Sequence, residues 1–464
     1  KSAGVGNADP TPASSLRFYT IDNGGGLTEV ASIDAGFLTD GIVFSGDGSR
    51  LYAANEGEPN DDYSIDPIGS VSIVSLDGDP ENPSMTEQEI AFPDLDSGVT
   101  LLGSGIRYSG KDGVTVSFGQ DAEAEYLAEA GGYLFVTLQE NNTVARIDLT
   151  TNLVDAYIGL GWVDYSQVSV DLDDRDAGFA PLTGQKVVGL RQPDGIAAWE
   201  EDGNPYFITA NEGDSREYED GGYIDERRNS GLGFESVPER LKLIVDGNNA
   251  DRALVLSNRI NDQDPANDLA FLEPSKPGKL KKTPVSFGSR SLTIFDGITG
   301  LTIWDSWMTD TIDGEEYNTS LQNIAEFAGV YDDGRSDDKG VEVESVAVLE
   351  YEGSRYALAV LERTDAGDGA EEIPRGGLLV VYDITDLENV DFVTYQTVSR
   401  SPEGIEILPA SESPTGQLLV GISSEFDSNS VELLDFGTLI TNGQGTLYLS
   451  QDNPLNDPSL YATL

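Results

Sequence analysis

Residues 194–212, with the sequence DGIAAWEEDGNPYFITANE, contain the pattern that decides the fold. The acidic residue Asp194 is followed by a small and then a β-branched residue, and a later apolar stretch ends on Glu212. Short apolar runs separated by a Gly/Asp/Asn turn predict paired β-strands. The arrangement occurs five times, and the opening acid and terminal glutamate of the copies are Asp40 and Glu56, Glu125 and Glu140, Asp194 and Glu212, Glu344 and Glu362, and Glu403 and Glu425.

Further strands follow this pair in most copies, for example at residues 69–74, 143–148 and 378–383. Four antiparallel strands per repeat are the blade of a β-propeller. The sequence therefore predicts an all-β fold, a β-propeller of four-stranded antiparallel blades, with about five and a half blades in this chain. The half blade is predicted from residues 16–21 and 27–33, which resemble third and fourth strands without a first and second.

The domain organisation follows from the spacing of the repeats. Residues 1–15 are rich in Gly, Ala, Pro and Ser and predict a linker or processed N-terminus, and residues 16–436 are predicted to form the propeller. Two acidic insertions are expected within it, at 213–286 with strands near 241–245 and 253–256, and at 310–340. Residues 437–464 are predicted to be a C-terminal extension.

A propeller must close, because open sheet edges invite aggregation. Three ways of completing the missing strands are open at this point. The C-terminal segment could supply them, the true chain could begin earlier, or a strand from a neighbouring copy or a surface or matrix partner could complete the blade.

The composition restricts the partners. The 464 residues include 83 acidic and 27 basic side chains, a net charge of −56, and the acids are dispersed along the chain. We expect no nucleic-acid partner and no affinity for anionic lipid, since both need basic surface. An acidic surface is also typical of proteins from saline habitats, and it promotes solubility. The sequence contains no run of about 18 apolar residues, so we expect no membrane insertion.

Histidine and cysteine are both absent. Their absence excludes disulfides, His-ligated zinc sites and Ser-His-Asp triads. Any bound metal would have oxygen ligands, which favours calcium, magnesium or manganese. We expect calcium, and a second oxygen-ligated metal is compatible with the same ligands.

The repeated acids predict where such ions bind. The first strand of each blade lines the channel of a propeller, so its opening acid should lie at one mouth, with the terminal glutamate of the next strand nearby. Solvated turn residues are the alternative, but five copies in register favour convergence. Clustered carboxylates repel one another unless cations offset their charge. The predicted metal ligands at this mouth are Asp40, Glu56, Glu125, Asp194, Glu212, Glu344, Glu362 and Glu403.

A second candidate calcium site is the segment DLDDRDAG at 171–178, where acids alternate before a glycine. Such spacing resembles calcium loops, although it is not that of an EF-hand. Its predicted ligands are Asp171, Asp173, Asp174 and Asp176. Weaker candidates are Asn60 to Asp62 with Asp66, and the acids from Asp332 and Asp333 through Asp337 and Asp338.

Several motifs resemble those of one known family. They are EAEY at 123–126 leading to VTLQENN at 136–142, ANEGEPNDDY at 54–63, QPDGI at 192–196, TANEGD at 209–214, FGSRS at 287–291, SDDKG at 336–340 and SPEG at 401–404. This set resembles the choice-of-anchor I family, which includes mesenchyme-specific cell-surface glycoproteins and bacterial proteins labelled alkaline phosphatase. The resemblance implies an extracellular, secreted or cell-surface, seven-bladed propeller. The sequence departs from the family at its start and at VEVES, residues 341–345.

Two functions fit these features. The first is a calcium-binding surface or matrix protein in which carboxylate-held ions provide rigidity or assembly. The alternative is a metal-dependent phosphomonoesterase, in which metals activate water. The basic residues nearest the repeats are Arg216, Arg290, Lys339 and Arg363. In the enzyme, Arg290 or Arg363 would hold phosphoryl oxygens and Lys339 would add charge. No nucleophile is identifiable.

Overall fold

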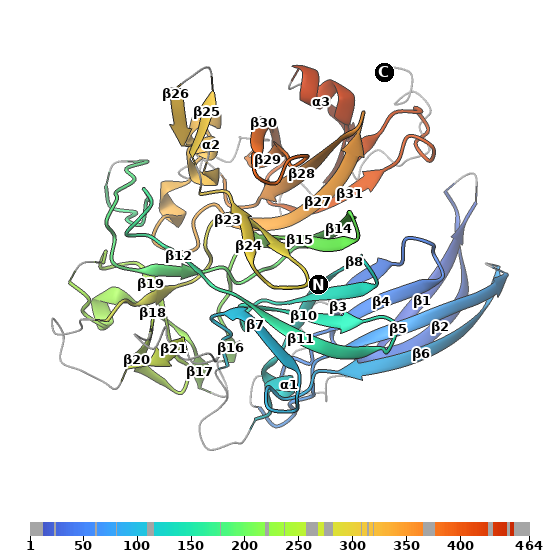
Figure 1. The fold of residues 1–464 in the computed structure, drawn as a ribbon, viewed down its shortest axis with the longest axis horizontal. Coiled ribbons are helices and arrows are strands. Elements are labelled where there is room, and N and C mark those ends of the chain that lie inside the picture. Colours follow the sequence, from blue (N-terminus) through green and yellow to red (C-terminus); the bar gives the residue numbers. More distant parts are fainter. Residues whose placement is uncertain are drawn as a thin grey trace.

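The computed structural model describes residues 13–449 except 23–24, 61–62, 80, 109–115, 177, 219–221, 236, 257–267, 273–281, 308, 313–314, 319, 365–375, 426–429 and 443–445. The described chain is an all-β propeller with short helices (Figure 1). Most of the segment predicted as an N-terminal linker, residues 1–12, lies outside the described residues.

Five four-stranded antiparallel sheets, here blades 1 to 5, carry the sequence repeat in the described part of the chain. Blade 1 comprises β3 (Thr39–Phe44), β4 (Arg50–Asn55), β5 (Ser70–Asp79) and β6 (Asn82–Ala91). Blade 2 comprises β8 (Ala124–Ala130), β9 (Tyr133–Leu138), β10 (Thr143–Asp148) and β11 (Leu153–Leu160), with β7 (Thr100–Ser104) added parallel to β11.

Blade 3 is interrupted by the longer insertion, which separates its second and third strands. It comprises β14 (Ile196–Glu201), β15 (Asn204–Asn211), β23 (Ser291–Asp296) and β24 (Thr302–Asp305). Blade 4 comprises β27 (Val343–Tyr351), β28 (Ser354–Leu361), β29 (Gly377–Asp383) and β30 (Asp391–Val398). Blade 5 comprises β31 (Pro402–Leu408), β32 (Leu419–Ser424), β33 (Ser430–Asp435) and β34 (Thr446–Leu449).

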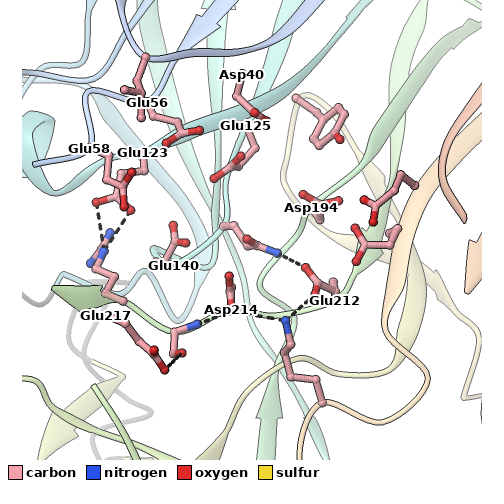
Figure 2. A pocket seen from close by; sticks show the side chains of 18 of the residues that line it. Asp40, Glu56, Glu58, Glu123, Glu125, Glu140, Asp194, Glu212, Asp214 and Glu217 are labelled. Carbon is pink, nitrogen blue, oxygen red and sulfur yellow. Dashed lines mark hydrogen bonds and ion pairs between the residues drawn. The ribbon is translucent and has the colours of Figure 1, made fainter. Parts of the chain in front are cut away.

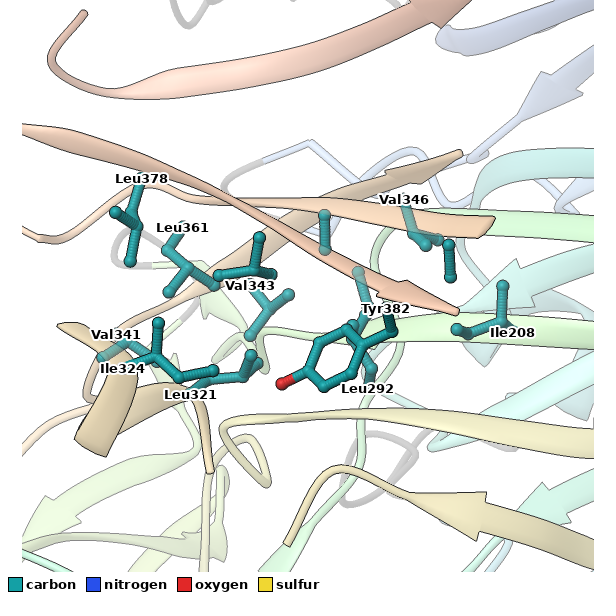
Figure 3. Close-up of a cluster of buried hydrophobic side chains, with 14 of the residues drawn as sticks. Ile208, Leu292, Leu321, Ile324, Val341, Val343, Val346, Leu361, Leu378 and Tyr382 are labelled. Carbon is teal, nitrogen blue, oxygen red and sulfur yellow. The ribbon is translucent and has the colours of Figure 1, made fainter. Parts of the chain in front are cut away.

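The blades follow one another in chain order around a common centre (Figure 1). The first strand of each blade contacts the first strand of the next, from β3 through β8, β14 and β27 to β31. Apolar side chains fill the spaces between blades. Between blades 3 and 4, for example, Ile208 and Leu292 pack with Val343 and Tyr382 (Figure 3). In blades 1 to 4 apolar clusters cover both faces of the sheet, and the central strands read as nearly continuous apolar runs. In blade 5, buried and more exposed positions alternate along β33.

A two-stranded sheet lies on blade 1. It comprises β1 (Ala13–Ile21) and β2 (Leu27–Phe37), which include the segments predicted as half a blade. Leu16 and Ala35 of this sheet pack against Leu51 and Val74 of blade 1. The apolar contact is of the kind that joins neighbouring blades.

The insertion at 213–286 forms most of a separate sheet with two strands that precede blade 3. The strands are β12 (Trp162–Asp164), β13 (Val188–Leu190), β18 (Glu226–Arg228), β19 (Lys242–Asp246), β20 (Asn249–Leu256), β21 (Leu269–Phe271) and β22 (Val285–Ser286). The two strands expected near 241–245 and 253–256 correspond to β19 and β20. A small hairpin of β16 (Glu217–Tyr218) and β17 (Tyr223–Ile224) precedes them.

The second insertion contains the hairpin of β25 (Thr309–Ile312) and β26 (Glu315–Asn318), followed by α2 (Leu321–Ala328). One face of α2 is buried between blades 3 and 4. Single turns of 3-10 helix lie at Asn229–Gly231 and Asp333–Arg335. The other α-helices of the described chain are α1 (Phe118–Asp121) and α3 (Phe436–Asn442).

The segment predicted as a C-terminal extension belongs in part to blade 5. Strand β34 pairs antiparallel with β33 and completes the four-stranded sheet. A domain boundary at residue 436 is therefore placed too early, because the backbone of β33 finds its hydrogen-bond partners in residues 446–449. Residues 450–464 lie outside the described chain.

Candidate metal centre

The acid that opens each repeat lies at an irregularity of the innermost strand. In blades 1, 2, 4 and 5 the register between the first two strands shifts at the acid. The acids at these shifts are Asp40, Glu125, Glu344 and Glu403. In blade 3 Asp194 comes two residues before β14. A β-bulge changes the direction in which a strand presents a side chain, so the repeated irregularity turns these acids toward a shared centre.

The small residue after the acid permits close contact between blades. A Cβ on Gly41 would lie 2.2 Å from the carbonyl oxygen of Glu125, in the next blade. At Gly195 the backbone N–H donates to the carbonyl of Glu344 over 3.0 Å, and a Cβ would lie 2.6 Å from that oxygen. The glycines therefore allow the acid-bearing segments of adjacent blades to touch.

The acids surround a cavity of about 770 Å³, here called the channel cavity. All eight ligands predicted for the channel mouth line it, together with Glu140 and Glu425, the two remaining glutamates of the repeat. Figure 2 shows Asp40, Glu125, Asp194 and Glu212 around this space. Four carboxylates that sequence reasoning did not select also line the cavity, and these are Glu58, Glu123, Asp214 and Glu217.

Three groups of carboxylates in or beside the channel cavity have oxygen atoms within 4.8 Å of one another. The groups are Asp40, Glu56 and Glu125, then Asp194, Glu212 and Glu344, and lastly Glu212, Glu342 and Glu362. Each spacing is compatible with one hard cation, which binds carboxylate oxygens at about 2.3–2.6 Å in the case of calcium. Each group also takes its members from two neighbouring blades. Glu342 was not selected because it stands outside the repeated pattern.

Electrostatic repulsion and loss of solvent disfavour ionisation in this cavity. Desolvation, followed by the charge of Glu56, holds the pKa of Glu125 well above its usual value, although part of its surface faces the cavity. Burial and then Glu212 have the same effect on the pKa values of Asp194 and Glu344. Burial raises the pKa of Glu212 itself to about 7, even though Lys339 acts in the opposite direction.

Two of the three proposed phosphate-binding residues line the channel cavity. The Nζ atom of Lys339 lies 2.5 Å from Glu212 and 3.4 Å from Glu342. The Nε atom of Arg363 lies 3.0 Å from Glu362, and 38% of its side chain is exposed. Both residues therefore place positive charge beside the second and third carboxylate groups.

A third cation, Arg216, also lines the cavity and was not assigned a role from the sequence. Its buried guanidinium pairs with Asp121 at 3.2 Å and Glu123 at 3.3 Å. Asp121 is the last residue of α1 and Glu123 follows it, and neither belongs to the repeat. Arg216 thus stabilises a local ion-pair network at one side of the cavity, and no pattern in the sequence indicated this pairing.

Arg290 is not a cavity residue, and its predicted contact with a phosphoryl group is wrong. The side chain is buried, with 2% of its surface exposed. Its terminal nitrogens donate to the backbone carbonyls of Asp171 at 2.6 Å, Ser336 at 2.9 Å and Asp338 at 3.0 Å. Arg290 therefore joins two loops inside the protein. It cannot hold a phosphate, because its terminal nitrogens already donate to these carbonyls.

Only two of the four acids predicted as a calcium loop lie close together. Asp171 and Asp176 lie together, with oxygens within 4.8 Å of each other and of Asp333. Asp173 instead accepts the backbone N–H of Arg175 at 3.3 Å. Asp174 forms an ion pair with Arg240 at 3.2 Å. Two of the four predicted ligands are therefore outside the group, because local turn contacts and an arginine direct them elsewhere.

The weaker candidates are mostly occupied by other contacts. Asp337 pairs with Arg228 and Arg240. Asp338 pairs with Lys242 at 3.0 Å. Asn60 accepts the backbone N–H of Ile65, and Asp66 accepts the side-chain amide of Gln120 at 3.4 Å. Asp61 and Asp62 lie outside the described residues.

Comparison with solved structures gives distant likenesses. A periplasmic gluconolactonase from Pseudomonas aeruginosa is 13% identical, with a TM-score of 0.35, and the match covers 93% of this chain and 90% of that one. Hydrazine synthase from Kuenenia stuttgartiensis is 12% identical, with a TM-score of 0.33 and coverages of 88% and 80%. AztD from Citrobacter koseri is 10% identical, with a TM-score of 0.33 and coverages of 95% and 81%.

No curated protein sequence matches the chain significantly. A family match, by contrast, covers most of it. The choice-of-anchor I domain matches residues 2–387, which include the repeats of blades 1 to 4 and both insertions. The chain therefore belongs to the choice-of-anchor I domain family.

Proposed function

We propose that the channel cavity binds divalent cations, with calcium as the expected ion, and that these ions link neighbouring blades. The observation that carries the proposal is the composition of the carboxylate groups. Asp40 and Glu56 of blade 1 meet Glu125 of blade 2, and Asp194 of blade 3 meets Glu344 of blade 4. Buried carboxylates of like charge are costly unless a cation compensates them.

The ligand chemistry supports calcium among the hard cations. The available ligands are carboxylates on several separate strands, and calcium accepts six to eight oxygens in flexible geometry, whereas magnesium requires a near-ideal octahedron. A protein held together in this way suits a structural, assembly or matrix role. We infer an extracellular or cell-surface location from the family, whose domains are associated with such proteins. None of the helices in the described chain is both long and apolar enough to cross a membrane.

The double variant Glu125→Gln with Glu344→Gln tests the proposal, since it removes one ligand from each of two groups in different blades. We expect calorimetric titration of this variant with calcium to show fewer bound ions than in the wild type. We also expect most of the calcium-dependent rise in melting temperature to be lost. Glutamine keeps the size of the side chain and removes the charge, so the packing should survive.

A matched control removes the same charge from the surface. Glu388 and Glu412 are exposed and lie outside the channel cavity. The double variant Glu388→Gln with Glu412→Gln should bind calcium as the wild type does. If the control loses as much calcium as the cavity variant, or if the cavity variant loses none, the ions bind elsewhere.

Metal-dependent phosphomonoester hydrolysis is a second candidate, favoured by the position of Arg363. Its guanidinium is partly exposed at the cavity wall beside Glu362 and Glu342, where it could hold a phosphoryl oxygen next to a bound ion. We would measure hydrolysis of a generic phosphomonoester with calcium and after chelation. Calcium-dependent turnover that Arg363→Ala reduces at least about tenfold would support the enzyme, whereas absence of turnover would leave the structural role.

A further inference from the structure

Two acidic segments that are about 160 residues apart in the chain meet outside the channel cavity. Asp171 and Asp176 come from the loop at 171–178, here called the acid loop, and Asp333 comes from the second insertion. Arg290 holds both segments in place, because it donates to the carbonyl of Asp171 and to those of Ser336 and Asp338. The meeting of the three acids is therefore built into the fold.

Helix α2 gives additional support to the acid loop. The side-chain amide of Gln322 donates to the carbonyl of Ser169 at 2.9 Å and accepts the backbone N–H of Asp171 at 3.3 Å. Asp171 is almost fully buried, with 1% of its surface exposed. A carboxylate is thus fixed in a position where it has little access to water.

An unpartnered hydroxyl faces the same group of acids. Tyr331 is 93% buried, and its hydroxyl lies beside the carboxylate of Asp171 without forming a hydrogen bond of good geometry within the described chain. Burial and then the charge of Asp171, with a further contribution from Asp333, raise the pKa of this hydroxyl. The ring is held in place by Phe179 of the adjoining segment, with ring centroids 4.8 Å apart. A buried oxygen without a partner beside three carboxylates is what a missing ligand would explain.

Arg290 places a positive charge beside this group, but its guanidinium donates to backbone carbonyls and forms no ion pair with the three carboxylates. The other basic residues nearby pair with different acids. Arg240 pairs with Asp174, Arg175 pairs with Glu239, and Arg335 pairs with Asp338 and Glu342. Within the described residues, no ion pair joins Asp171, Asp176 or Asp333 to an arginine or lysine. Burial and then the charge of Asp171 raise the pKa of Asp333 to about 6.

We propose that Asp171, Asp176 and Asp333 form a second cation site, the acid-loop site, which binds one hard divalent cation such as calcium. The oxygens of the three carboxylates lie within 4.8 Å of one another. The hydroxyl of Tyr331 lies beside them and would contact the ion directly or through water. The bound ion would hold the second insertion against the acid loop.

The acid-loop site has a consequence for the channel cavity. The chain that contributes Asp333 continues directly to Lys339 and Glu342, and both of these lie at or beside the cavity. A cation at the acid-loop site would therefore fix the backbone that positions a cavity lysine. The site does not depend on the cavity for its ligands, since no residue belongs to both.

Calcium titration of the full chain tests the site. We expect Asp333→Asn to bind one calcium ion fewer than the wild type, and Asp176→Asn, an exposed position, to behave in the same way. Asp173→Asn is the matched control, because Asp173 lies in the same loop but caps its own turn. Loss of one ion in both test variants and not in the control supports the site.

The same variants in the background of Glu125→Gln with Glu344→Gln separate this site from the channel cavity. In this background we expect Asp333→Asn to remove one further bound ion, because its site shares no ligand with the channel cavity. If Asp333→Asn and Asp176→Asn leave the number of bound ions unchanged in both backgrounds, the acid-loop site does not exist. If the background variant binds as the wild type does while Asp333→Asn still removes one ion, only the channel proposal fails.

Discussion

At the scale of single residues, the acid and the glycine beside it have complementary roles. The acid supplies the charge, and the glycine allows the next blade to approach closely enough for acids from two blades to form one group. Gly195 illustrates this, since its backbone N–H donates to the carbonyl of Glu344. Any side chain at this position would push the acid-bearing strand of blade 4 away from blade 3.

Replacing Gly195 by alanine should therefore destabilise the protein. The added Cβ would lie 2.6 Å from the carbonyl oxygen of Glu344, which is too close without a backbone shift. We expect the free energy of unfolding to fall by about 1–3 kcal/mol, the usual cost of overpacking, as measured by chemical denaturation. Gly46→Ala is the control, because nothing lies within 4 Å of its Cβ position. Equal stability of the two variants would contradict the role given to Gly195.

At the scale of elements, irregular pairing decides where the charges lie. A regular innermost strand would alternate its side chains between the two faces of the blade. The register shift at Glu344, between Val343 and Ser345, breaks that alternation and frees the acid to face the channel cavity. The insertions act differently, because they bring Lys339 and Arg216 to the cavity from outside the blades. Repeats thus supply most of the carboxylates, whereas two of the three cations come from the insertions and the third, Arg363, directly follows a repeat glutamate.

At the scale of the whole molecule, the net charge of −56 makes stability depend on pH and on cations. The carboxyls with raised pKa values are concentrated around the channel cavity and the acid loop. In those with lowered pKa values, hydrogen bonds from neighbouring residues stabilise the ionised form; Asp47 and Asp386 are exposed in turns, and Asp148 ends β10. The raised pKa values of the buried carboxyls should therefore determine how the stability of the cation-free protein changes with pH.

The cation-free protein should lose stability as the pH rises. Glu212 has its pKa raised from 4.5 to about 7 on folding, so the folded state holds its proton more tightly than the unfolded state. Its contribution to stability is complete below the unfolded pKa and is lost as the pH rises through about 7. We expect the melting temperature, measured in a chelator, to decrease as the pH rises from 4.5 to about 7. The decrease should be smaller in Glu212→Gln.

Calcium should reverse this trend, since protons and cations compete for the same oxygens. The calcium-dependent rise in melting temperature should grow as the pH rises through about 7 and the carboxylates ionise. A melting temperature in chelator that increases steadily over this interval would contradict the prediction. So would a calcium effect that is independent of pH.

The sequence by itself determined the blades and the ring of acids. The repeated acid, small residue and apolar strand are local patterns, and a propeller places equivalent positions of each blade around one axis, so Asp40 and Glu403 could be assigned to the same cavity without coordinates. The half blade at 16–33 and the strands of the first insertion followed from the same alternation.

The tertiary structure alone decided which acids are neighbours and which basic residues face them. Arg290 and Arg363 look alike in the sequence, but one is buried against backbone carbonyls and the other faces the cavity. Asp333 joins Asp171 only because the second insertion folds back onto the acid loop. Such contacts depend on how long insertions pack, and this is set by the sum of many weak interactions between residues far apart in the chain, which no local pattern records.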